Sequence, residues 1–196
     1  MLTNRTTVSS GLIALVLLVI LAADATAQWV ANPTNGHFYR LTENLYYGIH
    51  DESVNELTPN WMDAEAEAQT FNPNAHLVTI NNQAENDWLV ATFGSETGFW
   101  IGFTDHSEYS SEGNWVWISG QAVTFTNWDA IQPDNYLQGE DCAHLNHNGT
   151  NFWNDLGNDD SHGAGVYSPF YGIIEVPGEL VSSGSMGWAG IKAIYR

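Results

Sequence analysis

Eleven residues, from Gln132 to Cys142, constrain the fold of this chain more than any other stretch. They contain three carboxylates, three side-chain amides and one proline. A hard cation such as calcium takes about six to eight oxygen ligands from carboxylates, amide carbonyls and water. A rigid turn around Pro133 can direct the side chains of Gln132 and Asp134 to one point. The segment is therefore predicted to form one half of an oxygen-rich cation site.

The next acidic side chain downstream lies in the triplet Trp153-Asn154-Asp155. We expect this triplet to close the site from a neighbouring strand, while Glu140 reaches it from the far end of the loop. The expected cofactor is Ca2+, because every proposed donor is an oxygen. The predicted metal ligands are Gln132, Asp134, Glu140, Asn154 and Asp155.

The charge balance excludes some classes of partner. The chain carries 23 acidic and four basic residues, for a net charge of −19. Nucleic acid is not an expected partner, because phosphate binding needs Lys and Arg. An anionic membrane surface is not expected for the same reason. The excess of carboxylates suits a protein that holds divalent cations or works in salty surroundings, and simple solubility explains it equally well.

Residues 1–27 are predicted to be a secretory signal peptide. Arg5 supplies the positive start, residues 11–23 form a short apolar run, and Ala25-Thr26-Ala27 is a small-x-small cleavage signal. The apolar run is shorter than a membrane span needs. We therefore expect a secreted protein that begins near Gln28 and has no membrane segment after cleavage. The alternative is that the run stays uncleaved as an anchor.

The order of predicted elements indicates an α+β domain over residues 28–176. One helix is expected to open at Thr58-Pro59 and to stop at residues 72–74. A second is expected to be capped by Asn82 with Glu85 as its capping-box partner, and to end at Gly94. Residues 177–196 are either a tail or a final strand. The predicted strands cover residues 37–41, 45–49, 77–80, 99–103, 114–118, 142–145, 152–153 and 171–176.

Cys142 is the single cysteine of the chain, so no intramolecular disulfide can form. We expect it to be a small buried residue on a strand, and an intermolecular disulfide is the alternative. His144 and His147 resemble a metal pair only superficially. Two histidines three residues apart converge on a helix, whereas this region is predicted to be strand and loop.

An ordered set of motifs between residues 36 and 176 resembles the C-type lectin-like domain. The set comprises Trp61-Met62-Asp63-Ala64, His76-Leu77-Val78-Thr79-Ile80, Glu85, residues 100–105, residues 112–117, Asn127-Trp128, Gln132-Pro133-Asp134, Glu140-Asp141-Cys142, Trp153-Asn154-Asp155 and Ile174-Glu175. Each motif is weak alone, whereas the ordered set at family-like spacing is specific.

This resemblance implies a double-looped α+β fold in which one calcium ion also coordinates two sugar hydroxyls. Its ligand positions fall on the same five residues that the chemistry indicates, and it implies a cis peptide before Pro133. An auxiliary calcium site of the family would need Asp105, Glu108, Glu140 and Asp141, but only part of that pattern aligns, and a solvated loop is the alternative. The chain departs from the family in its cysteines, since none stands near Ala68, Asn158 or Ile174.

The order of the triplet at residues 132–134 implies a sugar class. In the family, Gln-Pro-Asp accompanies galactose-type sugars and Glu-Pro-Asn accompanies mannose-type sugars. Tyr136 stands where galactose-binding members often place an aromatic ring against the sugar. The Gly-rich insertion that many galactose binders carry before Glu140 is missing. The expected partners are galactose- or GalNAc-terminated glycans, bound by the five metal ligands together with Tyr136.

The leading hypothesis is thus a secreted calcium-dependent lectin. The alternative is a lectin-like domain that binds a protein partner, or calcium only. An enzyme is not expected, because no Ser/His/Asp set or carboxylate pair stands out at a legible spacing. Oligomerisation, which strengthens weak single sites through avidity, stays open.

Overall fold

A computed structural model describes residues 28–46, 60–136, 139–157 and 170–178. The predicted signal peptide, the end of the strand predicted at 45–49, and the chain beyond residue 178 lie outside these ranges.

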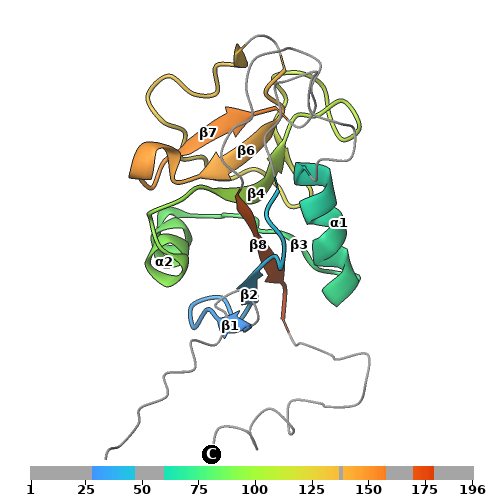
Figure 1. Cartoon of the computed structure of the whole chain (residues 1–196), viewed down its shortest axis with the longest axis vertical. Coiled ribbons are helices and arrows are strands. Elements are labelled where there is room, and N and C mark those ends of the chain that lie inside the picture. Colours follow the sequence, from blue (N-terminus) through green and yellow to red (C-terminus); the bar gives the residue numbers. More distant parts are fainter. Residues whose placement is uncertain (1–27, 47–59, 137–138, 158–169, 179–196) are drawn as a thin grey trace, which may run out of the picture.

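The described strands form one eight-stranded mixed sheet in the order β1-β2-β8-β4-β6-β7, with β3 paired to β8 and β5 paired to β4. The β4–β8 pair is parallel and the other pairs are antiparallel. Figure 1 shows α1 and α2 on opposite sides of the molecule, with β6 and β7 near one end. The predicted α+β class is confirmed. The elements are β1 (Val30–Ala31), β2 (Phe38–Leu41), α1 (Trp61–Phe71), β3 (His76–Leu77), α2 (Gln83–Phe93), β4 (Phe99–Thr104), β5 (Val116–Trp117), β6 (Cys142–Leu145), β7 (Trp153–Leu156) and β8 (Tyr171–Val176).

Helix α1 begins at Trp61, two residues after Pro59. Asn60 is the N-cap, and its side chain accepts hydrogen bonds from the main-chain N–H groups of Met62 and Asp63. Asp63 completes a capping box by accepting from the Asn60 N–H group. The prediction that Thr58-Pro59 opens the helix is therefore wrong, because an Asn side chain satisfies free N–H groups that proline cannot serve. The predicted stop is confirmed by the C-cap at Asn72.

Helix α2 has the predicted N-cap at Asn82 and the predicted end at Gly94, but Glu85 does not play its predicted role. Asn82 accepts from the Glu85 N–H group, and Gly94 caps the C-terminus with φ at 100°, which favours glycine. Glu85, however, does not close the capping box. Its carboxylate accepts from the N–H group of Asn81 and from the hydroxyl of Tyr39. This buried carboxylate thus bonds groups outside the helix instead of the N–H group of the N-cap residue Asn82.

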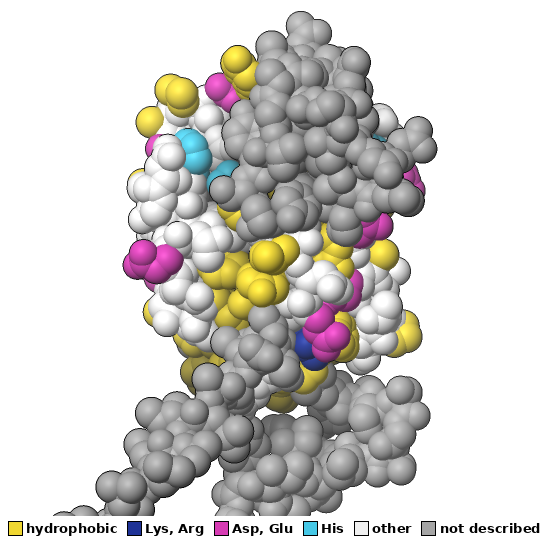
Figure 2. Space-filling model, viewed as in Figure 1, with side chains coloured by type: hydrophobic (Ala, Val, Ile, Leu, Met, Phe, Trp, Pro, Cys, Tyr) yellow, Lys and Arg dark blue, Asp and Glu magenta, His cyan; other side chains and the backbone are white. Residues whose placement is uncertain are grey.

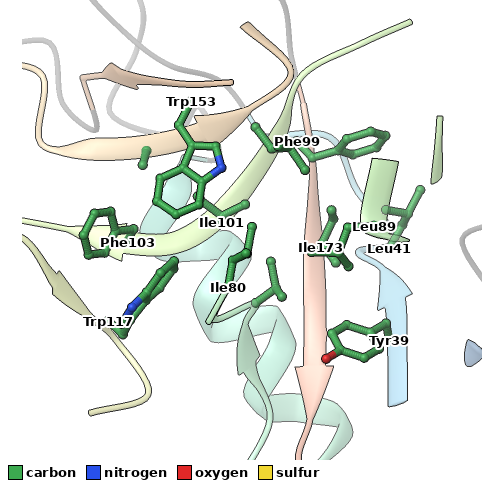
Figure 3. Packing of buried hydrophobic residues seen from close by; sticks show 13 residues of the cluster. Tyr39, Leu41, Ile80, Leu89, Phe99, Ile101, Phe103, Trp117, Trp153 and Ile173 are labelled. Atoms are coloured by element: carbon green, nitrogen blue, oxygen red, sulfur yellow. The ribbon is translucent and has the colours of Figure 1, made fainter. Parts of the chain in front are cut away.

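The core is rich in aromatic rings. Trp61, Trp100, Trp117 and Trp153 are all at most 2% exposed. Figure 3 shows Trp117 and Trp153 on one side of the main cluster, with Tyr39, Leu41 and Leu89 on the other. Large fixed rings of this kind bury much apolar surface and hold the sheet in place.

Cys142 lies on β6 with no exposed surface, and it forms no disulfide. The prediction of a buried residue on a strand is confirmed. An intermolecular disulfide is not compatible with this burial. Where the family resemblance expects cysteines near residues 68 and 174, Ala68 and Ile174 share a buried apolar cluster.

Two buried carboxylates connect separate elements. Glu65 on α1 accepts from the N–H group of Leu77 and contacts the Nδ1 atom of His76 at 2.7 Å. Glu175 on β8 accepts from the N–H group of Thr79 and contacts the Nδ1 atom of His37 at 2.5 Å. The carboxylates thereby hold α1 and β8 to the segment around β3.

These pairs predict a pH dependence of stability. Hydrogen bonds to Glu175 and Glu65 raise the pKa of His37 and of His76 above 6.5. A raised pKa in the folded state means that the stabilisation is fully present below pH 6.5 and is lost as pH rises through the folded value. In urea unfolding, a His37→Asn/His76→Asn double variant is expected to lose more stability below pH 6.5 than above it. An equal loss at every pH would contradict the assignment.

Candidate metal centre

Three of the predicted metal ligands converge in the folded chain. One carboxylate oxygen from each of Asp134, Glu140 and Asp155 lies within 4.8 Å of the other two. Asp134 is exposed, whereas Glu140 is 4% exposed and Asp155 is fully buried. Asp134 and Glu140 come from the loop before β6, and Asp155 comes from β7. The loop before β6 and strand β7, which were predicted to share one cation site, therefore meet in the fold.

Main-chain hydrogen bonds hold the loop around these carboxylates. Asp155 accepts from the N–H groups of Asp134 (3.2 Å) and Asn135 (2.8 Å). Glu140 accepts from the N–H group of Tyr136 at 2.9 Å. The peptide bond between Gln132 and Pro133 is cis, as the family resemblance implies. Loop and carboxylates thus fix each other's position.

Asn135 has a structural role that the sequence did not reveal. Its side-chain oxygen accepts from the Glu140 N–H group at 3.1 Å, and its φ of 44° lies in the left-handed region. Asn adopts this region more readily than most residues. The signal available in the sequence was an Asn inside a loop of predicted ligands, and that signal does not distinguish a supporting residue from a ligand.

The electrostatics of this centre favour a cation. Burial raises the pKa of Asp155 to about 7, and the charge of Glu140 adds to this effect, while the N–H group of Asn135 opposes it. Arg40 is the sole Lys or Arg among the described residues, and it lies on β2 beside Glu43. On the face shown in Figure 2, the acidic side chains are scattered, and the visible basic side chain lies beside one of them. Three oxygen donors with little nearby positive charge fit Ca2+ and not a metal that prefers nitrogen or sulfur.

The other predicted site residues take different positions. The Oε1 atom of Gln132 accepts from the Asp134 N–H group at 3.0 Å, so this side chain adjoins the three carboxylates. Tyr136 is 54% exposed. Asn154 precedes Asp155 on β7, where successive side chains point to opposite faces, and its amide donates to the Asp155 carbonyl. Asn154 lines a pocket of about 440 Å³ together with His144 and Phe170.

The four residues of the implied auxiliary site do not gather into a second group. Within the described ranges, Asp134, Glu140 and Asp155 form the one set of three or more acidic, His or Cys donors at metal-binding separations. Asp105 is 2% exposed, and its Oδ2 atom accepts from the Gly113 N–H group. Burial raises its pKa to about 6, with smaller contributions from the charges of Glu112 and Asp141.

The two histidines near β7 lie 6.0 Å apart between ring centroids but have different partners. His144 is buried, with its ring stacked on Phe170 at 4.9 Å between centroids, and burial lowers its pKa to about 3. The Nδ1 atom of His147 instead pairs with Asp129 at 2.9 Å.

Among the described residues, no helix has the length and apolarity that crossing a membrane requires.

Comparisons with known proteins agree with this geometry. The family model of the C-type lectin domain matches residues 58–164. The alpha-N-acetylgalactosamine-specific lectin of Patiria pectinifera is 43% identical over an alignment of 103 residues, and the match covers 48% of this chain and 59% of that protein. The chain therefore spans less than two thirds of that relative. Lectin BRA-3 of Megabalanus rosa is 32% identical over 143 residues, or 72% of this chain and 81% of that protein.

A solved structure extends the likeness to three dimensions. The carbohydrate-recognition domain of the mouse scavenger receptor C-type lectin superposes with a TM-score of 0.57 at 29% identity. The match covers 78% of this chain and 96% of that domain. The family model, the lectin of Megabalanus rosa and the shared fold together show the family of this chain. The chain belongs to the C-type lectin domain family, which is non-enzymatic.

Proposed function

We propose that this protein is a secreted lectin that binds galactose- or GalNAc-terminated glycans in a calcium-dependent manner. The observation that carries the proposal is the convergence of Asp134, Glu140 and Asp155 within 4.8 Å. These carboxylates would hold Ca2+, and Gln132 would complete the set. Asn154 would join it only by turning out of the pocket that its side chain lines with His144. The bound ion would supply coordination positions for two neighbouring sugar hydroxyls.

The chemistry of the ligands supports a sugar preference. Each ligand side chain can also meet a sugar hydroxyl, and an amide can donate a hydrogen bond where an ionised carboxylate can only accept one. With Gln132 first and Asp134 third, donor and acceptor stand in the order that accompanies galactose-type sugars in the family. The specificity in the name of the Patiria pectinifera relative supports the same class.

Tyr136 is the proposed contact for the apolar face of the sugar. Its side chain is 54% exposed while its main-chain N–H group is held by Glu140. An exposed ring on an anchored backbone can pack against a sugar at small entropic cost.

Titration calorimetry of the mature protein with galactose and with mannose tests the proposal, each sugar in calcium and in chelator. We expect galactose to bind only when calcium is present. We also expect it to bind more strongly than mannose. A preference for mannose would refute the argument from the order of the triplet. Heat that is unchanged by chelator would refute the metal's role.

The alternative is a domain that binds a protein partner, or calcium alone. The missing Gly-rich insertion before Glu140 favours this alternative. Saturable calcium binding without any ligand on a broad glycan panel would establish it in place of the lectin.

A further inference from the structure

The candidate centre joins two segments that are distant in sequence, and Asp129 lies at the junction. The Asp129 N–H group donates to the Trp153 carbonyl at 2.9 Å, and its own carbonyl accepts from the Gln132 N–H group at 3.0 Å. Its Oδ1 atom accepts from the Ala130 N–H group at 2.7 Å. One residue thus connects the start of β7, which carries Asp155, with the loop that carries Asp134.

His147 extends this connection to the turn between β6 and β7. Its Nδ1 atom donates to the Oδ2 atom of Asp129 at 2.9 Å, and its Nε2 atom accepts from the Asn148 amide at 3.1 Å. The His147 main chain is fixed in turn, since its N–H group donates to the Phe152 carbonyl at 3.0 Å.

We propose that Asp129 and His147 are positioning residues for the calcium centre. Neither belongs to the converging carboxylates, and together they hold the loop bearing Gln132 and Asp134 at a fixed position against β7. This inference rests on the proposed calcium binding. Groups that only orient metal ligands typically change metal affinity about 10- to 100-fold when they are removed.

The partial exposure of His147 and Asp129 allows a positioning role to be distinguished from a role in stabilising the fold. The side chains of His147 and Asp129 are 24% and 28% exposed. Partly exposed ion pairs contribute little to stability, so removing His147 should leave the protein folded. A loss of calcium affinity without a comparable loss of stability is the signature of positioning.

Calcium affinity and urea stability of the full mature chain test the inference. In His147→Ala, the dissociation constant for calcium is expected to rise about tenfold. His147→Asn, which can place an amide donor near the former Nδ1 position, is expected to recover most of that affinity. The matched control is His76→Ala, which removes a His–carboxylate pair between α1 and β3. It should lower stability and leave calcium affinity unchanged.

Asp129→Ala provides a second route if His147→Ala does not fold. The double variant should bind calcium no more weakly than the weaker single variant, because both substitutions break the same connection. Parental affinity in His147→Ala or in Asp129→Ala would overturn the positioning role. Failure of the parent protein to bind calcium would instead overturn the proposed function, so the two failures are distinct.

Discussion

Replacing Asp134 with Ala is expected to abolish calcium-dependent retention on galactose resin and to weaken calcium binding by at least about a hundredfold. Residues that merely orient metal ligands are already worth about 10- to 100-fold, and Asp134 is one of the three converging carboxylates. Because its side chain is exposed, the substitution should leave the fold intact. Calorimetry with calcium and circular dichroism together measure both properties.

Glu43→Ala is the matched control, since it removes an exposed carboxylate that pairs with Arg40 beside β2, at the other end of the sheet from β7. It should retain parental calcium binding and parental retention on the resin. If Asp134→Ala keeps its affinity while folded, the assignment of this carboxylate as a ligand is wrong.

Trp153→Ala is expected to reduce the free energy of unfolding by about 3–5 kcal/mol, the usual cost of removing a large buried ring. Trp153 has no exposed surface and contacts the rings of Phe103, Trp117 and Trp128. Its indole N–H group also donates to the Asn86 side chain at 2.7 Å. Urea unfolding followed by circular dichroism gives the change in free energy.

A Trp153→Phe variant separates packing from hydrogen bonding at this position. It keeps an aromatic ring but leaves the Asn86 oxygen without its donor, for an expected cost of about 1–3 kcal/mol. Equal destabilisation by both variants would show that the indole hydrogen bond, and not ring packing, dominates.

Local signals predicted both ends of α2, and they failed for the side chain of Glu85, where a distant group competes. Asn82 and Gly94 cap α2 as expected, because each acts on its own neighbours. Glu85 carries the same kind of local signal, yet its carboxylate is bound by Tyr39, 46 residues away. No pattern within the helix reveals that partner.

The candidate centre shows the same division. Ligand chemistry and spacing identified Asp134, Glu140 and Asp155, which the fold brings together. The connection between Asp129 and His147 could not be predicted, since it depends on how the turn after β6 lies against the loop. Asn154 lies on β7. The side of the strand to which its side chain points depends on the pleat of β7, which cannot be predicted from the residue type.

The single buried cysteine makes folding of this domain independent of oxidation. The expected family positions near residues 68 and 174 are occupied by packed Ala68 and Ile174, and Glu65 and Glu175 hold the neighbouring elements. No bond within the chain can be broken by a reductant, because Cys142 is the sole cysteine. The domain can therefore fold in a reducing cytoplasm without a disulfide isomerase, with its thiol shielded inside β6.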